Sequence, residues 1–194
     1  MNTAEQLKDR FVVPINSWHV KLNEDLDESD RKAQEGLSPT CLAIAEGPMA
    51  LYPGVSENGR FYSEELWETQ LSKIGPRMEK GGLFGAIGHE QELNEKAIAD
   101  GDISHRTVSL WPDKDNGVLM GRIRILNTDS GKNLNTYMRE GMPIAVSSRA
   151  YGKAHESKQG PNGSVLIDPD TYFLETFDFV VNPGVDAAYP RIVE

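Results

Sequence analysis

The chain has 194 residues, enough for one domain with a substantial core. Its 20 basic and 30 acidic residues give a formal charge of −10, which argues against a nucleic-acid partner, because such partners need concentrated positive charge. The single cysteine, Cys41, excludes an intramolecular disulfide and a multi-cysteine zinc site. No apolar run approaches the roughly 20 residues of a membrane span, and the N-terminal residues lack the features of a signal peptide. We therefore expect no membrane partner.

Residues 1–40 are rich in polar and turn-forming residues. The segment 23–40 is especially dense in acidic residues, which is typical of a solvated loop. We therefore expect residues 1–40 to form an N-terminal arm or loop that is partly mobile, with 11–15 as a candidate short strand. Residues 41–194 are expected to form the folded domain.

The folded part is predicted to begin with an apolar strand at 41–51, in which the Gly-Pro pair at 47–48 indicates a bulge or bend. A helix is expected after Ser63, whose side chain can cap it. This helix presents one apolar stripe, formed by Trp67, Leu71 and Ile74. The Gly-Pro pair at 75–76 is expected to end it.

Strand character returns several times along the rest of the chain. The predicted strands lie at 83–89, 103–111, 118–126, 143–152 and 172–183. A second helix is predicted over 129–141, where Leu134 and Met138 share a face. Helices do not separate the strands regularly, which disfavours a parallel doubly wound sheet. We predict an α+β fold that is mainly β, an antiparallel barrel or sandwich with helices on its outside.

Several common functional signatures are absent from the sequence. It contains no P-loop, no GxGxxG dinucleotide motif, no HExxH zinc-protease motif and no GxSxG nucleophile elbow. The four histidines are too scattered to predict a metal site. We therefore expect neither a metal nor another cofactor.

His89 is the first candidate for chemistry, because it follows the Gly-rich apolar segment 83–88. A histidine at a strand end can open onto a pocket and exchange a proton near neutral pH. The alternative is a partly exposed histidine in a turn.

Ser147 and Ser148 are the second candidates, in a segment whose other residues are small or β-branched. A serine oxygen becomes a nucleophile when a base takes its proton, and small neighbours leave room for a substrate carbonyl. Arg149 adds positive charge where an oxyanion could form. The alternative is that these are the polar positions of an alternating strand, with a solvated arginine.

Asp178 is the third candidate. Because Phe177 and Phe179 flank it, its carboxylate either faces the opposite side of the strand or is buried and paired. Beside a histidine it would hold the imidazole tautomer and stabilise the imidazolium. Its alternative role is an outward-facing strand aspartate. His105 competes for the third position, and Asp186 is less favoured because it lies in a turn-rich segment.

Taken together, these segments resemble the prohead core proteases of T-even-like tailed bacteriophages, serine peptidases that mature the capsid. The resemblance covers roughly residues 42–190 and lies in the order of the segments more than in any single one. The matching segments are NGRFY at 58–62, GAIGH at 85–89, the strand pair 103–111 and 118–126, the helix ending in REG, AVSSRAYG at 145–152 and FDFVVNPGVDAAY at 177–189.

The resemblance implies an assemblin-like fold, similar to the herpesvirus assemblin protease: a mostly antiparallel β-barrel wrapped by helices. It implies that residues 41–194 are a serine protease domain, with Ser147 as nucleophile and His89 as base. Asp178 is the expected third member because of its position on the strand after the nucleophile, with His105 as the alternative. Backbone N–H groups from Ser147 to Arg149 are the expected oxyanion donors.

Four positions depart from the family pattern. Ala86 and Glu90 replace the Glu and Pro of the GELxHP segment that usually contains the histidine. Ala145 and Ala150 replace the glycines that often flank the serine pair. Alanine adopts positive φ less readily than glycine. These changes therefore bear on the oxyanion geometry more than on the nucleophile.

The resemblance implies an endopeptidase made as a zymogen and active inside the assembling prohead, in the host cytoplasm. Its substrates would be phage scaffold and capsid proteins, cut after Glu in an aliphatic-x-Glu context. The final residues match this pattern, so we expect autocatalytic cleavage at Glu194, with an arginine such as Arg149 pairing the P1 carboxylate. The same pattern recurs at 22–24, 26–28, 44–46, 66–68 and 93–95.

Two other readings remain open at this point. The chain could be a non-enzymatic β-barrel that serves as a scaffold or structural head protein. It could also be a small-molecule esterase, which would need a deep apolar pocket that no segment indicates. A homo-oligomer is compatible with the sequence in every case.

Overall fold

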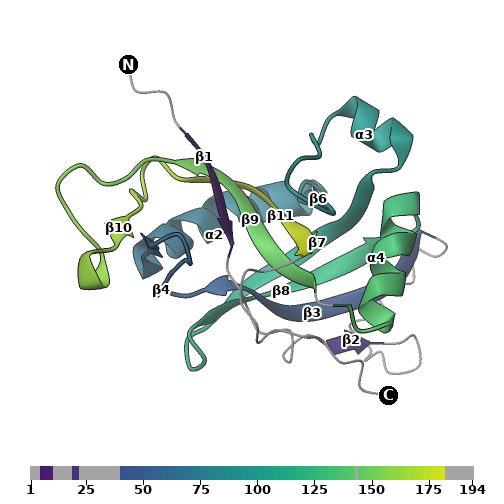
Figure 1. The fold of residues 1–194 in the computed structure, drawn as a ribbon, viewed down its shortest axis with the longest axis horizontal. Coiled ribbons are helices and arrows are strands. Elements are labelled where there is room, and N and C mark those ends of the chain that lie inside the picture. The colour runs from purple at the N-terminus through teal and green to yellow at the C-terminus, as the bar shows by residue number, and fades with distance from the viewer. Residues whose placement is uncertain (1–4, 11–18, 22–39, 143, 182–194) are drawn as a thin grey trace.

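The structure is a computed structural model that describes residues 5–10, 19–21, 40–142 and 144–181. Strands dominate these residues, and three α-helices accompany them (Figure 1). The helices are α2 (Glu64–Glu79), α3 (Glu95–Asp100) and α4 (Asp129–Arg139). The prediction of a mainly β, α+β fold is confirmed. None of the described helices is long and apolar enough to cross a membrane.

The largest sheet has five strands, each antiparallel to its neighbours. Their order is β2 (His19–Lys21), β3 (Cys41–Leu51), β8 (Val118–Leu126), β7 (Ile103–Asp113) and β6 (Phe84–Ala86). The register of β3 against β8 shifts between Pro48 and Ala50, beside the predicted bulge. The predicted strand pair β7–β8 forms the centre of this sheet.

A second sheet has three antiparallel strands and contains the candidate nucleophile. Its order is β1 (Glu5–Arg10), β9 (Ile144–Gly152) and β11 (Phe173–Val181), so β9 is central. In Figure 1, β9 and β11 run across the larger sheet. A small third sheet joins β4 (Gly54–Val55), β5 (Arg60–Tyr62) and β10 (Val165–Leu166) beside a 3₁₀ turn at Pro161–Gly163.

The described strands do not close into the predicted barrel. The two large sheets approach each other at β6 and β11, where one isolated parallel bridge joins Ile87 to Phe179. The ladder cannot extend further along β6, because that strand has three residues and its pairing with β7 shifts between Gly85 and Ala86. The two sheets share one hydrophobic core, and the bridge between Ile87 and Phe179 lies beside the candidate site.

Helix α2 begins as the sequence predicts and ends later. Ser63 caps it by accepting a hydrogen bond from the backbone N–H of Leu66, and Trp67 is fully buried. The helix continues through Pro76 to Glu79 instead of ending at Gly75-Pro76. Arg77 anchors the turn after the proline by donating to the backbone oxygens of Leu174 and Glu175 on β11. This anchoring offsets the hydrogen bond that proline cannot make.

Helix α4 buries Leu134 and Met138 as predicted. The short helix α3 was not predicted, although the sequence holds both of its end signals. The Asn94 side chain accepts from the backbone N–H of Ala97, and Gly101 ends the helix in the left-handed conformation. Helix α3 follows the loop that contains His89.

Candidate active site

Ser147 and Asp178 lie opposite each other in the second sheet. They are Cα partners on the antiparallel strands β9 and β11, and both side chains are fully buried. Phe177 and Phe179, which flank the aspartate, belong to the hydrophobic core. The alternation of the strand therefore turns the carboxylate away from the core cluster. Asp178 is buried and paired, and the outward-facing alternative is wrong.

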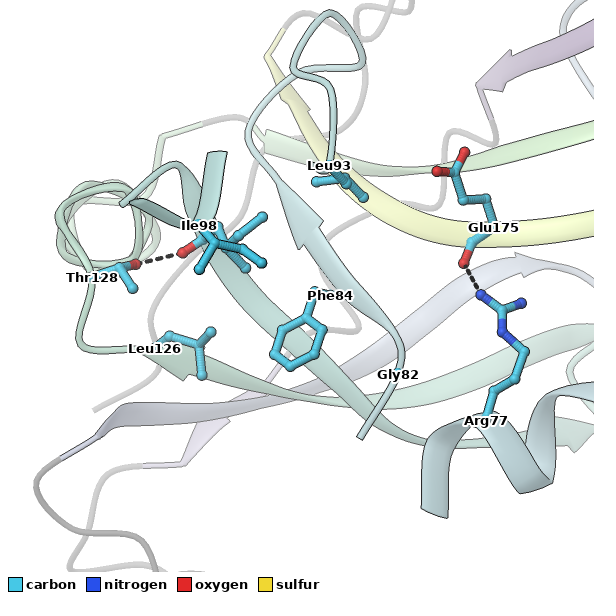
Figure 2. Close-up of a pocket in the computed structure, with 9 residues that line it drawn as sticks. Arg77, Gly82, Phe84, Leu93, Ile98, Leu126, Thr128 and Glu175 are labelled. Atoms are coloured by element: carbon cyan, nitrogen blue, oxygen red, sulfur yellow. Dashed lines mark hydrogen bonds between the residues drawn. The ribbon is translucent and has the colours of Figure 1, made fainter. Parts of the chain in front are cut away.

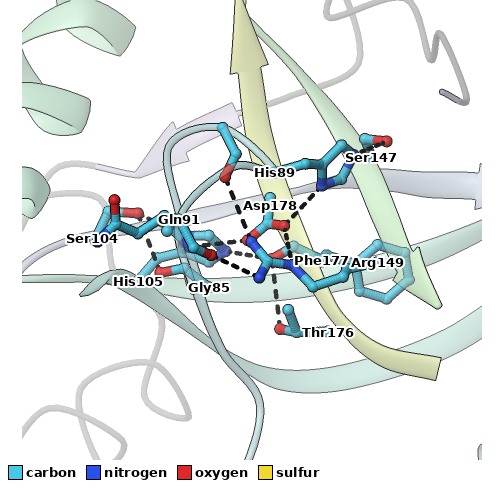
Figure 3. A network of polar contacts seen from close by, with 12 residues as sticks. Gly85, His89, Gln91, Ser104, His105, Ser147, Arg149, Thr176, Phe177 and Asp178 are labelled. Atoms are coloured by element: carbon cyan, nitrogen blue, oxygen red, sulfur yellow. Dashed lines mark hydrogen bonds and ion pairs between the residues drawn. The ribbon is translucent and has the colours of Figure 1, made fainter. Parts of the chain in front are cut away.

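His89 joins these two residues from a separate segment. It follows β6 after Gly88, which has a φ of +85° and donates its backbone N–H to the Phe179 oxygen at 2.7 Å. The His89 Nδ1 atom lies 2.8 Å from Asp178 Oδ2, and Nε2 lies 2.7 Å from Ser147 Oγ (Figure 3). The fold thus brings all three predicted site residues into one chain of contacts.

The ionisation of Asp178 decides how protons are placed in this chain of contacts. Burial raises the pKa of the carboxyl, but hydrogen bonds from His89, the Ala86 N–H and Arg149 outweigh it, so the pKa lies below its ordinary value. An ionised carboxylate only accepts hydrogen bonds, so His89 Nδ1 must carry its proton. Nε2 is then the acceptor that faces the Ser147 hydroxyl, the orientation a general base needs.

His105 lies on β7, paired with Gly85 of β6, and does not replace Asp178. Its Nε2 donates to the backbone oxygen of Phe177 at 3.0 Å, and its Nδ1 lies 2.8 Å from the Ser104 hydroxyl. Burial lowers the pKa of His105 to about 4, so the ring is neutral at physiological pH. It supports the backbone beside Asp178, whereas Asp178 occupies the position at Nδ1 of His89.

The Arg149 guanidinium is buried, with 4% of the side chain exposed. Its Nε donates to Asp178 Oδ2 at 2.8 Å, and its terminal nitrogens donate to the backbone oxygens of Gln91 at 2.7 Å and Gly88 at 3.4 Å. The alternative of a solvated arginine is therefore wrong. The charge is already paired inside the site, so Arg149 is not placed to receive a substrate carboxylate or an oxyanion.

The predicted oxyanion donors are also engaged elsewhere. Residues 147–149 lie on the central strand of their sheet, with paired neighbours on both β1 and β11. Their backbone N–H groups therefore face other strands instead of a substrate. Ser148 turns away from its neighbour Ser147, and its buried hydroxyl has no partner among the described residues.

Three contributors to the site were not predicted. The backbone N–H of Ala86 donates to Asp178 Oδ1 at 3.0 Å, a role that any residue type can fill. The Gln91 side chain donates to Asp102 Oδ2 at 2.5 Å and ties down the loop after His89. Gly85 allows the close approach, because a Cβ there would lie 2.2 Å from the Phe177 oxygen. The run of glycines before His89 was the signal for that approach.

A separate pocket of about 390 Å³ lies on the Phe84 side of β6 (Figure 2). Its lining is mostly apolar and includes Leu93, Ile98 and Leu126, with Arg77 and Glu175 also among the lining residues. Because Phe84 and Gly85 are adjacent on the strand, their positions face opposite sides of it. None of His89, Ser147 and Asp178 lines this pocket.

No protein-family model matches the chain, and no curated protein sequence matches it. Among solved structures, it is similar to the bacteriophage T4 capsid assembly protease, with a TM-score of 0.62. The two chains are 18% identical, and the alignment covers 93% of this chain and 97% of the T4 chain. At this level of identity the likeness concerns the fold. The chain therefore has the fold of a capsid assembly protease.

Proposed function

We propose that the protein is a phage prohead maturation endopeptidase of the serine type. One observation carries the proposal: Ser147 Oγ, His89 and Asp178 form a continuous chain of hydrogen-bond contacts of 2.7 and 2.8 Å. The likeness in fold to the T4 capsid assembly protease supports the same reading independently of those distances.

In the proposed mechanism, His89 Nε2 takes the hydroxyl proton as Ser147 Oγ attacks the scissile carbonyl. The Asp178 carboxylate stabilises the imidazolium that forms, because it stays ionised and accepts the hydrogen bond from His89 Nδ1–H throughout. His89 then protonates the leaving amine, and the acyl group remains on Ser147. Water, activated by the same imidazole, releases the acyl group. General base action of this kind contributes roughly 10²–10⁴ in rate.

The contacts favour this reading over the two alternatives. A structural head protein would gain little from burying the charges of Asp178 and Arg149, since removal from water costs several kcal/mol per ion. A small-molecule esterase would need its apolar pocket at the nucleophile, and Ser147 is absent from the lining of the pocket in Figure 2.

The proposed substrates are phage scaffold and capsid proteins, cut after Glu inside the assembling prohead in the host cytoplasm. Three internal aliphatic-x-Glu sequences are protected from such cleavage: 44–46 lies within β3, 66–68 within α2, and 93–95 runs into the start of α3. The sequences at 22–24 and 26–28, and the proposed self-processing site at Glu194, lie outside the described residues.

The test is incubation of the full chain with a peptide taken from a phage scaffold protein that contains an aliphatic-x-Glu sequence. We expect cleavage after the Glu and labelling of Ser147 by a serine-directed phosphonate, both located by mass spectrometry. The Ser147→Ala variant should do neither. The proposal is wrong if the peptide stays uncut and the chain stays unlabelled. It is also wrong if the Ser147→Ala variant cuts the peptide as well as the wild type does.

Self-processing is tested separately with a chain extended beyond Glu194. Under assembly-like conditions the active form should shorten to Glu194, and the Ser147→Ala form should keep its full length. Equal shortening of both forms would assign the cut to another protease. Retention of full length by both would show that this site is not used.

A further inference from the structure

We propose that Arg149 is a positioning residue, which fixes the Asp178 carboxylate and the turn of His89 relative to Ser147. This inference rests on the proposed serine-protease function and deepens it. Arg149 itself does not touch a substrate. It acts through the two residues that handle the proton.

The guanidinium holds the turn of His89 from both sides. It donates to the backbone oxygen of Gly88, the residue before the histidine, and to that of Gln91, two residues after it. The imidazole therefore sits in a short turn whose two flanks are bound to one buried side chain (Figure 3). The Gln91 side chain continues the anchoring by bonding Asp102.

The same guanidinium also fixes the carboxylate. Arg149 Nε and His89 Nδ1 both donate to Oδ2 of Asp178, and the Ala86 N–H donates to Oδ1. With donors on both oxygens the carboxylate cannot rotate without losing a charge-assisted hydrogen bond. Its direction toward the imidazole is therefore set before any substrate binds.

Arg149 links these contacts to the nucleophile through its strand. It lies two positions after Ser147 on β9, so the two side chains project from the same face. Strand β9 is paired on both sides, so it holds Ser147 and Arg149 in fixed positions relative to each other. A shift of about 1 Å in such an arrangement can cost roughly 10²-fold in rate.

Lysine could not reproduce this arrangement. The planar guanidinium offers its donors in a fixed geometry. In this site they reach Oδ2 of Asp178 and the backbone oxygens of Gln91 and Gly88, which lie on either side of His89 in the sequence. An ammonium group is a single point of charge on a flexible stem. It could pair Asp178, but it would lose one or both of the contacts to the His89 turn.

The test compares Arg149→Ala and Arg149→Lys with Arg77→Ala, a matched control. Arg77 also donates to two backbone oxygens, those of Leu174 and Glu175, but it holds α2 against β11. We measure kcat and KM for the scaffold-derived peptide, together with thermal unfolding. Arg149→Ala should lower kcat by about 10²-fold with KM within about threefold, Arg149→Lys should fall between, and Arg77→Ala should keep kcat within about threefold.

Chemical rescue gives a readout that a general loss of stability would not produce. Millimolar guanidinium ion, well below denaturing concentrations, should raise kcat of Arg149→Ala about tenfold and leave Arg77→Ala unchanged. If Arg149→Ala does not fold, Arg149→Lys decides by its kcat. Three results would overturn the positioning role. The first is a folded Arg149 variant with unchanged kcat, and the second is a variant in which only KM rises. The third is a folded Arg149→Ala protein that guanidinium does not rescue.

Proton NMR separates this inference from the proposed function, because it does not require cleavage. The His89 Nδ1 proton bound to Asp178 should give a far-downfield resonance, assigned by its loss in His89→Gln. This resonance should broaden or vanish in Arg149→Ala and persist in Arg77→Ala. If the wild-type chain cuts no peptide but shows this pattern, the proposed function fails and the positioning of the ring stands. Persistence of the signal in Arg149→Ala overturns the positioning role.

Discussion

Gly85 on β6 lies so close to His105 on β7 that a Cβ atom at position 85 would be 2.4 Å from His105 Nε2. The same atom would be 2.2 Å from the backbone oxygen of Phe177. This approach allows β6 to pass beside β11 and to present the Ala86 N–H to Asp178. A residue without a side chain is therefore a condition for the geometry of the site.

Replacing Gly85 by alanine should destabilise the fold by about 1–3 kcal/mol, because backbone and a buried ring must move apart. It should also reduce peptide cleavage by displacing the Ala86 N–H from Asp178. Urea unfolding and kcat measure the two effects. The control is Gly75→Ala in α2, where a Cβ meets nothing within 4 Å and a small gain in stability is expected. Equal behaviour of the two variants would contradict the close approach.

The two adjacent serines should respond in opposite ways to alanine. Ser147→Ala should abolish cleavage and leave the fold intact, because it removes only the proposed attacking oxygen. Ser148→Ala should keep its activity and unfold no more easily than the wild type, since it removes a buried hydroxyl without a described partner. Peptide cleavage and thermal unfolding test both statements. The reverse pattern would place the nucleophile on the other face of β9.

Asp178→Asn should lower kcat by roughly 10²–10⁴-fold, since an amide cannot stabilise the imidazolium as a carboxylate does. It should also destabilise the fold by about 3–5 kcal/mol, because Arg149 loses its buried counter-ion. The native pKa of Asp178 is lowered, so the carboxylate stabilises the fold above the unfolded pKa near 3.8, and this contribution is lost as pH falls through the lower native value.

The difference in unfolding free energy between the wild type and Asp178→Asn should therefore be constant above about pH 5 and shrink below about pH 4. Urea titrations at a series of pH values measure it. A difference that does not change down to the acid limit of folding would show that Asp178 is not ionised in the folded protein.

His105 should make the fold sensitive to mild acid. The unfolded chain binds a proton at this residue near pH 6.5, whereas the folded chain does so only near pH 4. Protons therefore favour the unfolded state, and stability falls by about 1–3 kcal/mol as pH is lowered between these values. His105→Gln should unfold with a shallower pH dependence. A slope equal to that of the wild type would contradict the assignment.

Much of the fold could be predicted from local patterns. Apolar runs located β3, β7, β8, β9 and β11, and Ser63 marked the start of α2 because a cap acts on the backbone next to it. The end of α2 could not be predicted, since it depends on contacts between Arg77 and β11, nearly one hundred positions away. The prediction of a closed barrel failed for the same reason. Closure depends on how far β6 pairs with β11, and these two strands lie far apart in the sequence.

In the candidate site, too, local sequence patterns indicated some features, and contacts between distant segments set the others. The sequence neighbours of His89, Ser147 and Asp178 made each a candidate, and the resemblance to the prohead proteases implied their roles. The structure brings the three together. The partner of Arg149 could not be found this way. Strand alternation places Arg149 on the face of Ser147, but it does not say which carboxylate lies across from that face. Charge alone suggested a substrate, whereas the fold supplies Asp178.

The position of β11 late in the chain has a consequence for protein synthesis. A nascent chain that has not yet emerged past residue 178 already contains His89 and Ser147, but it lacks the carboxylate and the strand that pairs with β9 along one side. Such a chain cannot orient its imidazole. For the proposed protease, the order of strands alone thus delays activity until translation of the whole sheet is complete, before any control by assembly begins.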